Sequence, residues 1–207
     1  MNLVFYTAPM SSATPVATIL SELEVPHQRI EFDLSQQNQR APEFLELNPN
    51  GKVPTLVVDG TPIFEGLAIM QWLGDRFGVA KGLWPASDDP ARLQALSWTT
   101  WSYVTFIQAV MRFNIAGNAP NPAEKSPAQR ERCLKELEGY LDILEARLVE
   151  RSFVLGNEFS LVDLIIACTV AYGAMCGVLL DRHERVAKWL SVCQSRPSFK
   201  NEWGGGA

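Results

Sequence analysis

The chain has little of what builds metal and redox sites. It holds two histidines, His27 and His183, which are far apart in the sequence. Four cysteines occur, with none before Cys133 and no C-x-x-C pair among them. We therefore expect no metal site, and we expect reduced, mostly buried thiols rather than reactive cysteines, as is usual in the cytoplasm.

Long runs of like charge and long apolar runs are also missing. The net charge is −5, and the lysines and arginines are scattered, which argues against a nucleic-acid partner. The longest apolar window, residues 164–180, contains polar residues and glycines, so it predicts a buried core helix rather than a membrane span. The first residues lack the basic start and cleavage site of a signal peptide. We expect a cytoplasmic protein without a membrane partner.

What is present in residues 1–78 predicts a small α/β domain. Asp59-Gly60 is a strong two-residue hairpin signal, and Pro62 marks the returning strand as an edge strand. Pro15 suits the first turn of a helix that Ser12 or Thr14 could cap. The periodicities predict the order βαβαββα, the plan of a thioredoxin-like domain, over residues 3–6, 16–23, 30–34, 42–47, 52–58, 61–64 and 65–77.

The rest of the chain shows no strand signal and predicts an all-helical domain over residues 91–207. Residues 79–90, rich in glycine, proline and aspartate, form the expected linker. A proline-rich loop is expected over 114–127, and the tail 204–207 is expected to be disordered. Apolar spacing predicts helices over residues 91–113 and 128–151, from residue 160 onward, and over 183–195.

Three local features of the first domain suggest a binding site. Val53-Pro54 precedes a strand, where a cis proline would leave the backbone free to pair with an extended ligand. Glu65-Gly66 opens a helix whose N–H groups can hold a carboxylate, and Glu65 can bind an ammonium group. The hydroxyls of Ser11 and Ser12 could stabilise a thiolate. Together they describe a site for glutathione.

The chain resembles the soluble glutathione transferase superfamily over nearly its whole length. Residues 48–56, NPNGKVPTL, look like the family's N-P-x-G-K-V-P-x-L signature, and residues 65–69 look like its E-S-x-A-I segment. Residues 155–163 are similar to the start of the family's buried helix, where Ser160 and Asp163 form a capping box. Gly66 stands where the family usually has serine, so we expect weaker glutathione binding than usual.

The resemblance implies a role for each matching residue. The chain looks like a serine-type bacterial enzyme related to the phi, theta and beta classes. Ser11 takes the position of the catalytic serine of plant-type (phi) enzymes, where beta-class enzymes have cysteine, and its hydroxyl would lower the pKa of the glutathione thiol. Ser12 and Tyr6 remain alternatives, although Tyr6 could face the other side of the sheet. The expected glutathione-binding residues are Ser12, Gln39, Lys52, Val53, Pro54, Glu65 and Gly66, and the expected electrophile pocket comprises Met10, Trp101, Phe106 and Val110.

The implied function is that of a detoxifying glutathione S-transferase. It would ionise the thiol of its co-substrate glutathione for attack on a small apolar electrophile or a peroxide, without a metal. One alternative is a non-catalytic glutathione-binding or interaction protein. Another is a dedicated glutathione-dependent isomerase, dehalogenase or lyase. By analogy with the family, we also expect a homodimer.

Overall fold

The computed structural model describes residues 1–204. The chain divides into two compact units, one of Met1–Ala86 with the segment that begins at Ser195, and the other of Ser87–Gln194. Of the tail expected to be disordered, Gly204 forms a bend after the last helix, and residues 205–207 lie outside the described residues.

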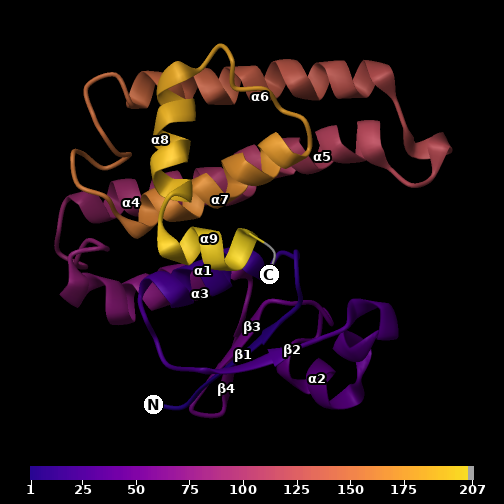
Figure 1. Ribbon diagram of the computed structural model, residues 1–207. Coiled ribbons are helices and arrows are strands. Elements are labelled where there is room, and N and C mark those ends of the chain that lie inside the picture. The colour runs from indigo at the N-terminus through magenta and orange to yellow at the C-terminus, as the bar shows by residue number, and fades with distance from the viewer. Residues whose placement is uncertain (205–207) are drawn as a thin grey trace. The chain divides into compact units, whose positions relative to one another are not determined.

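The first unit contains a four-stranded sheet in the order β2-β1-β3-β4 (Figure 1). β1 pairs in parallel with β2 and antiparallel with β3, and β3 pairs antiparallel with β4. This mixed sheet with its helices is thioredoxin-like, as the sequence predicts. The elements are β1 (Leu3–Thr7), α1 (Thr14–Glu22), β2 (Gln28–Glu31), α2 (Pro42–Leu47), β3 (Thr55–Val58), β4 (Thr61–Phe64) and α3 (Gly66–Leu73).

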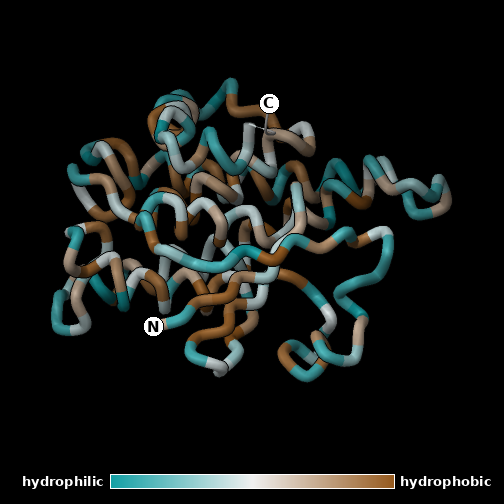
Figure 2. The backbone as a smooth tube through the Cα atoms, turned by 60° about the horizontal axis from the view of Figure 1, so that its bottom comes forward, coloured by the Kyte–Doolittle hydropathy of each residue, from teal (hydrophilic) through white to brown (hydrophobic). Residues whose placement is uncertain are grey.

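The helices of this unit cover both faces of its sheet. α1 and α3 lie together on one side and α2 on the other (Figure 1). Phe5 of β1 and Leu56 of β3 are fully buried, and hydrophobic brown segments of the tube lie beside the N-terminus in Figure 2. On the α2 side, the ring of Phe44 lies 5.2 Å from that of Tyr6 and 4.9 Å from that of Phe32. The two central strands are therefore buried, whereas the outer strands β2 and β4 are largely exposed.

The turn chemistry at the sheet edge follows the sequence. Asp59 and Gly60 both have positive φ, at 48° and 87°, as a type I′ hairpin turn requires. β4 is the edge strand that Pro62 indicates. The predicted caps of α1 are wrong, because the helix starts after Ala13 with no side-chain cap. The Oγ1 of Thr14 instead accepts a hydrogen bond from the N–H of Ser11.

A helix that the sequence analysis missed, α9 (Pro197–Trp203), belongs to the first unit and packs on α1. The helix expected over 183–195 does end before Arg196-Pro197, but Pro197 then occupies the first turn of a new helix, where its missing N–H costs nothing. The sequence had assigned this segment to the second domain. In Figure 1, α9 lies along α1.

Polar contacts fix α9 to α1. Arg196 donates hydrogen bonds to the carboxylate of Glu22, whose side chain is 7% exposed, and Ser198 donates to the same carboxylate. The indole N–H of Trp203 donates to the Oγ1 of Thr18 at 3.1 Å. Although burial alone raises the pKa of Glu22, its hydrogen bonds with Arg196 and Ser198 and the positive charge of Arg196 outweigh burial, so that the pKa is lowered.

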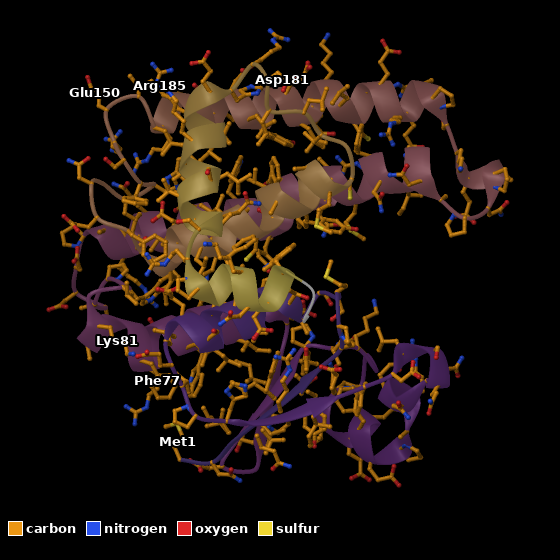
Figure 3. The ribbon with its side chains drawn as sticks, in the orientation of Figure 1. Met1, Phe77, Lys81, Glu150, Asp181 and Arg185 are labelled. Atoms are coloured by element: carbon orange, nitrogen blue, oxygen red, sulfur yellow. The ribbon has the colours of Figure 1, made fainter. Side chains whose placement is uncertain are left out.

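The second unit is helical throughout its regular structure. The expected single helix over 91–113 is longer than predicted and changes to a wider π-helical turn in its middle, η5, so residues 114–118 are helix rather than loop. Arg185, labelled in Figure 3 at the start of α8, forms an ion pair with Glu145 of α6. The elements are α4 (Ala91–Thr100), η5 (Trp101–Phe106), α5 (Ile107–Asn118), α6 (Pro127–Arg147), α7 (Leu161–Met175) and α8 (Glu184–Gln194).

The core of the second unit is α7, as the apolar window predicts. The capping box of Ser160 and Asp163 at its start is confirmed. The buried carboxylate of Asp163 also accepts hydrogen bonds from the N–H of Val154 at 2.7 Å and from the indole of Trp189 at 3.0 Å. All four cysteines are buried in this unit. None of the helices among residues 1–204 is long and apolar enough to cross a membrane.

We predict that Glu22→Gln destabilises the protein at neutral pH by about 2–3 kcal/mol, because it leaves Arg196 without its counter-charge. A carboxyl group with a lowered folded-state pKa contributes stability above its unfolded pKa of about 4.3, and this contribution is lost as pH falls. The difference between wild type and Glu22→Gln in urea denaturation should therefore shrink between pH 7 and pH 3. Lys200→Ala, an exposed change on α9, should have little effect. An equal loss from both substitutions would contradict the prediction.

We also predict that Asp163→Asn destabilises the protein by about 2–4 kcal/mol despite its nearly identical shape. The two carboxylate oxygens each accept two hydrogen bonds, whereas one of the corresponding atoms in asparagine is an NH₂ group that faces donors. Urea denaturation monitored by tryptophan fluorescence measures the change. A stability within about 0.5 kcal/mol of wild type would show that these bonds contribute little.

Candidate functional site

The strand register brings the expected site residues to one edge of the sheet. Tyr6, near the end of β1, pairs with Thr55 at the start of β3, and Thr55 pairs with Phe64 at the end of β4. The loop after β1, the residues before β3 and the first residues of α3 therefore meet at the same edge. They carry, in turn, Ser11 and Ser12, Val53 and Pro54, and Glu65 and Gly66.

Ser11 lies half-buried at the tip of α1, within a network of local hydrogen bonds. Its Oγ donates to the carbonyl of Ala8 at 2.7 Å and accepts from the N–H of Ala13 at 3.1 Å. A hydroxyl has one proton to donate, so Ser11 must turn that proton away from Ala8 before it can donate to a thiolate. The N–H of Ala13 still holds the oxygen in place when the proton turns.

Ser12 is exposed, and its hydroxyl already has a partner. Its Oγ donates to the carbonyl of Val53 at 2.8 Å and thereby ties the tip of α1 to the segment before β3. This contact uses the single hydroxyl proton of Ser12. Of the two serines, Ser11 is thus the one whose bond is local to its own loop, whereas the bond of Ser12 joins two parts of the site.

The segment before β3 is fixed by a buried amide that the sequence analysis did not single out. The side-chain NH₂ of Asn48, which is 2% exposed, donates to the carbonyl of Lys52 at 2.7 Å and to the Oγ1 of Thr55 at 3.0 Å. The Val53–Pro54 peptide bond is cis, as predicted. Val53 precedes the paired residues of β3, and its carbonyl retains a second lone pair beside the bond from Ser12.

The start of α3 combines a strained residue with unpaired helix donors. Glu65 is exposed and has φ 72° and ψ 112°, a conformation that costs about 1–3 kcal/mol in residues other than glycine and that clusters at binding sites. Gly66 is the first residue of α3, where N–H groups lack partners within the helix and the helix dipole favours an anion. This end of α3 is suited to a carboxylate.

Gln39 and Lys52 lie on the flank of this edge. Gly51 has φ 56°, and a Cβ atom there would lie 2.9 Å from the carbonyl oxygen of Gln39, so the loop carrying Gln39 packs directly against the turn before Lys52. The side-chain oxygen of Gln39 is buried without a hydrogen-bond partner, whereas Lys52 is exposed. A buried amide oxygen accepts hydrogen bonds and does not attract a carboxylate, so Gln39 would have to turn its NH₂ group to bind one.

A pocket of about 440 Å³ opens beside the Ser11 loop. Its walls come from that loop and from the end of β2 with the turn after it. The lining residues are Ala8, Pro9, Glu31, Phe32, Asp33, Leu34 and Ser35. Met10, the next residue in the loop, is 58% exposed and has a positive φ of 47°, which is unusual for its type.

Most of the residues expected to line the electrophile pocket are not exposed in the structure. Phe106 and Val110 are 1% and 0% exposed, and they pack against Gly173 of α7. They are core residues of the second unit, because the helix turns these positions inward. Trp101 is half-buried, and its ring lies 5.8 Å from that of Phe106 and 6.2 Å from that of Tyr140. Of the four residues expected in the pocket, Met10 alone is exposed.

Two sets of surface residues were not among the site residues expected from the sequence. Those lining the pocket lie in a stretch that reads as a plain strand and loop, and only its alternation of acidic and apolar residues, Glu31 to Leu34, could have indicated it. The exposed apolar side chains of α5 and its neighbour α7, Met111, Ile115 and Met175, are 40%, 49% and 60% exposed. Tyr6 packs among Phe32 and Phe44 rather than beside the serines.

The arrangement can hold an extended peptide with charged ends. The main-chain carbonyl of Val53 can accept a further hydrogen bond. Glu65 supplies a carboxylate, and the first N–H groups of α3 can donate to an anion. The hydroxyl of Ser11 can rotate to donate its proton to a ligand. A thiol placed at the tip of α1 would meet Ser11 and the positive end of the helix dipole, both of which favour the thiolate. The arrangement can therefore support nucleophilic attack by a bound thiol.

Comparison with known proteins agrees with this geometry. Residues 10–76 match the model of the glutathione S-transferase N-terminal domain, and residues 127–191 match that of the C-terminal domain. Glutathione S-transferase 3 of Zea mays is 29% identical over 96% of this chain and 91% of its own length. Disulfide-bond oxidoreductase YfcG of Escherichia coli is 28% identical over 93% of this chain and 90% of its own.

Among solved structures, glutathione transferase URE2P6 of Phanerochaete chrysosporium, in complex with oxidized glutathione, superposes with a TM-score of 0.87. It is 22% identical, and the match covers 98% of this chain and 95% of that chain. This likeness supports the fold of both units. With matches to both domain models of one family, in order along the sequence, the chain belongs to the glutathione transferase superfamily.

Proposed function

We propose that the protein is a glutathione transferase that binds glutathione at the edge of the first unit's sheet and uses Ser11 to stabilise its thiolate. The observation that carries the proposal is the convergence of Ser11, Val53 and the Glu65-Gly66 helix start at that edge, in a chain of this family. The main chain of Val53 pairs with the cysteinyl residue, and α3 holds the γ-glutamyl carboxylate. Glu65 binds the γ-glutamyl ammonium group.

The thiolate then attacks an apolar electrophile, and the leaving group departs with the electron pair of the broken bond. Ser11 gives no proton away in this step. Its hydroxyl turns from Ala8 to the sulfur and donates a hydrogen bond, which favours the charged form. Proximity of the two reactants supplies the rest of the rate gain. Met10 and the pocket beside it belong to the electrophile site, and we propose that two chains form a homodimer.

Two rival functions use the same first unit. A non-catalytic glutathione-binding protein would bind the tripeptide without turnover, and a dedicated glutathione-dependent isomerase, dehalogenase or lyase would turn over one substrate class. A third candidate, disulfide reduction, is suggested by the similarity to YfcG and by the oxidized glutathione in the Phanerochaete structure. All four cysteines are buried in the second unit, so a second glutathione would have to resolve the mixed disulfide.

We predict that Ser11→Ala lowers kcat/KM for a chromogenic aryl halide by about 10- to 100-fold at pH 6.5, since a hydrogen bond to a charged group contributes about 1.5–3 kcal/mol. The loss should diminish toward pH 9, where the thiol ionises without help. Glutathione affinity, measured by calorimetry, should change little. Ser12→Ala is the matched variant, and it should weaken glutathione binding through Val53 without moving the pH profile.

The result also separates the rivals. An active wild type whose profile is not moved by Ser11→Ala would contradict the role of Ser11. Glutathione binding without turnover of aryl halides, peroxides or 2-hydroxyethyl disulfide would favour the binding protein or a dedicated enzyme. Turnover of the disulfide alone would favour the reductase, and no glutathione binding would overturn all four functions.

We predict that Gly66→Ser tightens glutathione binding about 10-fold or more by adding a hydroxyl donor for the ligand's carboxylate. Gly66 lies in the first helical turn and its φ is not positive, so serine fits without backbone strain. Gly66→Ala, which stiffens the same backbone without a hydroxyl, is the control. Equal affinities for the serine and alanine variants in calorimetry would show that no carboxylate lies at this position.

A further inference from the structure

The pocket beside the Ser11 loop is lined by apolar and acidic residues. Pro9, Phe32 and Leu34 supply apolar surface, and Glu31 and Asp33 supply two carboxylates. Leu34 is 40% exposed, so part of its apolar surface is accessible to a ligand. A volume of about 440 Å³ lies in the range of small-molecule sites.

The pocket is continuous with the proposed catalytic loop. Ala8 and Pro9 form one of its walls, and the carbonyl of Ala8 is the atom to which the hydroxyl of Ser11 donates. A molecule in the pocket therefore lies against the loop that presents Ser11. This continuity identifies the occupant as the electrophile that a thiolate at Ser11 would attack, a step that rests on the proposed function.

The charges around the pocket are predominantly negative. Asp33 accepts hydrogen bonds from the side chain and N–H of Ser35 and from Gln36, which lower its pKa and keep it ionised. Glu31 is held 3.7 Å from Arg29, a loose pair, because Arg29 contacts Glu202 of α9 more closely, at 3.0 Å. Arg29 is thus shared between two carboxylates, and Asp33 has no cation among its hydrogen-bond partners in the described chain.

We propose that this pocket selects electrophiles that carry a positive charge next to an apolar body and discriminates against anionic ones. The apolar part covers Phe32 and Leu34, and the cationic group lies beside Glu31 and Asp33. Both carboxylates are exposed, so the attraction is moderate and depends on salt. This preference concerns the choice of electrophile and is separate from the activation of the thiol by Ser11.

The test uses three benzyl chlorides that differ only at the para position, which bears a trimethylammonium-methyl, an ethyl or a carboxymethyl group. One methylene separates each charge from the ring, and each enzymatic kcat/KM is divided by the uncatalysed rate constant with glutathione. We expect the cationic compound to exceed the anionic one by about 3- to 10-fold at low salt, with the preference largely lost at about 1 M salt.

The variants are Glu31→Gln with Asp33→Asn, in which asparagine still accepts the bonds of Ser35. They should reduce the cation-to-anion ratio of kcat/KM to about one, with both values divided by that of the ethyl compound for the same variant. Glu150→Gln with Glu158→Gln, a change at two exposed acids of the second unit, removes the same number of charges and is the control for net charge. Turnover of all three compounds with no charge preference, or a preference that the double variant retains, overturns the pocket's role while the proposed function stands.

A binding measurement keeps the two failures distinct. Unreactive (4-ethylbenzyl)trimethylammonium and 4-ethylphenylacetate are titrated into the ¹⁵N-labelled full chain, with S-methylglutathione present. The inference predicts tighter binding of the cation, with shifts at the amides of Phe32, Asp33 and Leu34 that the double variant abolishes. If no benzyl chloride is turned over, the proposed function fails with these substrates, and this titration still decides whether the pocket prefers cations. Shifts elsewhere, or none, overturn the inference.

Discussion

The antiparallel pairing of β1 with β3 is the constraint on which the proposed site depends. Because Tyr6 pairs with Thr55, the loop that follows β1 must emerge beside the residues that precede β3. The same ladder continues to β4, so the start of α3 reaches that edge as well. A shift of one residue would turn every side chain of β3 to the other face and bury the wrong set. Core packing and site assembly therefore specify the same register.

Given this register, a few side-chain hydrogen bonds fix the loops at this edge of the sheet. Ser12 links α1 to Val53, and Asn48 holds the turn before β3 from beneath. These bonds join segments about 41 and 4 to 7 residues apart in the sequence. They satisfy main-chain carbonyls that would otherwise be costly to bury, and they leave Ser11 and the N–H groups of α3 for a ligand. Structural and functional polar groups are thus separated within one loop system.

The sequence predicted the parts of this arrangement that depend on local pattern. The order βαβαββα, the hairpin at Asp59-Gly60 and the capping box at Asp163 all follow from short-range signals. The helix after Pro197 was missed because proline ends one helix and starts another equally well, and only packing on α1 decides between them. Phe106 and Val110 were misplaced for a similar reason, since an aromatic stripe does not tell which face of a helix meets the core.

The hydroxyl of Ser11 has a single proton, which stabilises the loop in the chain without ligand and would stabilise a bound thiolate in the proposed reaction. In the chain without ligand, the hydroxyl donates that proton to the carbonyl of Ala8, so it is not left without a hydrogen-bond acceptor. Transfer of the bond to a thiolate exchanges a neutral acceptor for a charged one, which strengthens the bond roughly twofold. In the proposed mechanism, the carbonyl of Ala8, a residue that lines the acidic pocket, loses this donor when glutathione binds. One rotation about the Cβ–Oγ bond of Ser11 would then couple glutathione binding to the local hydrogen bonds of the loop.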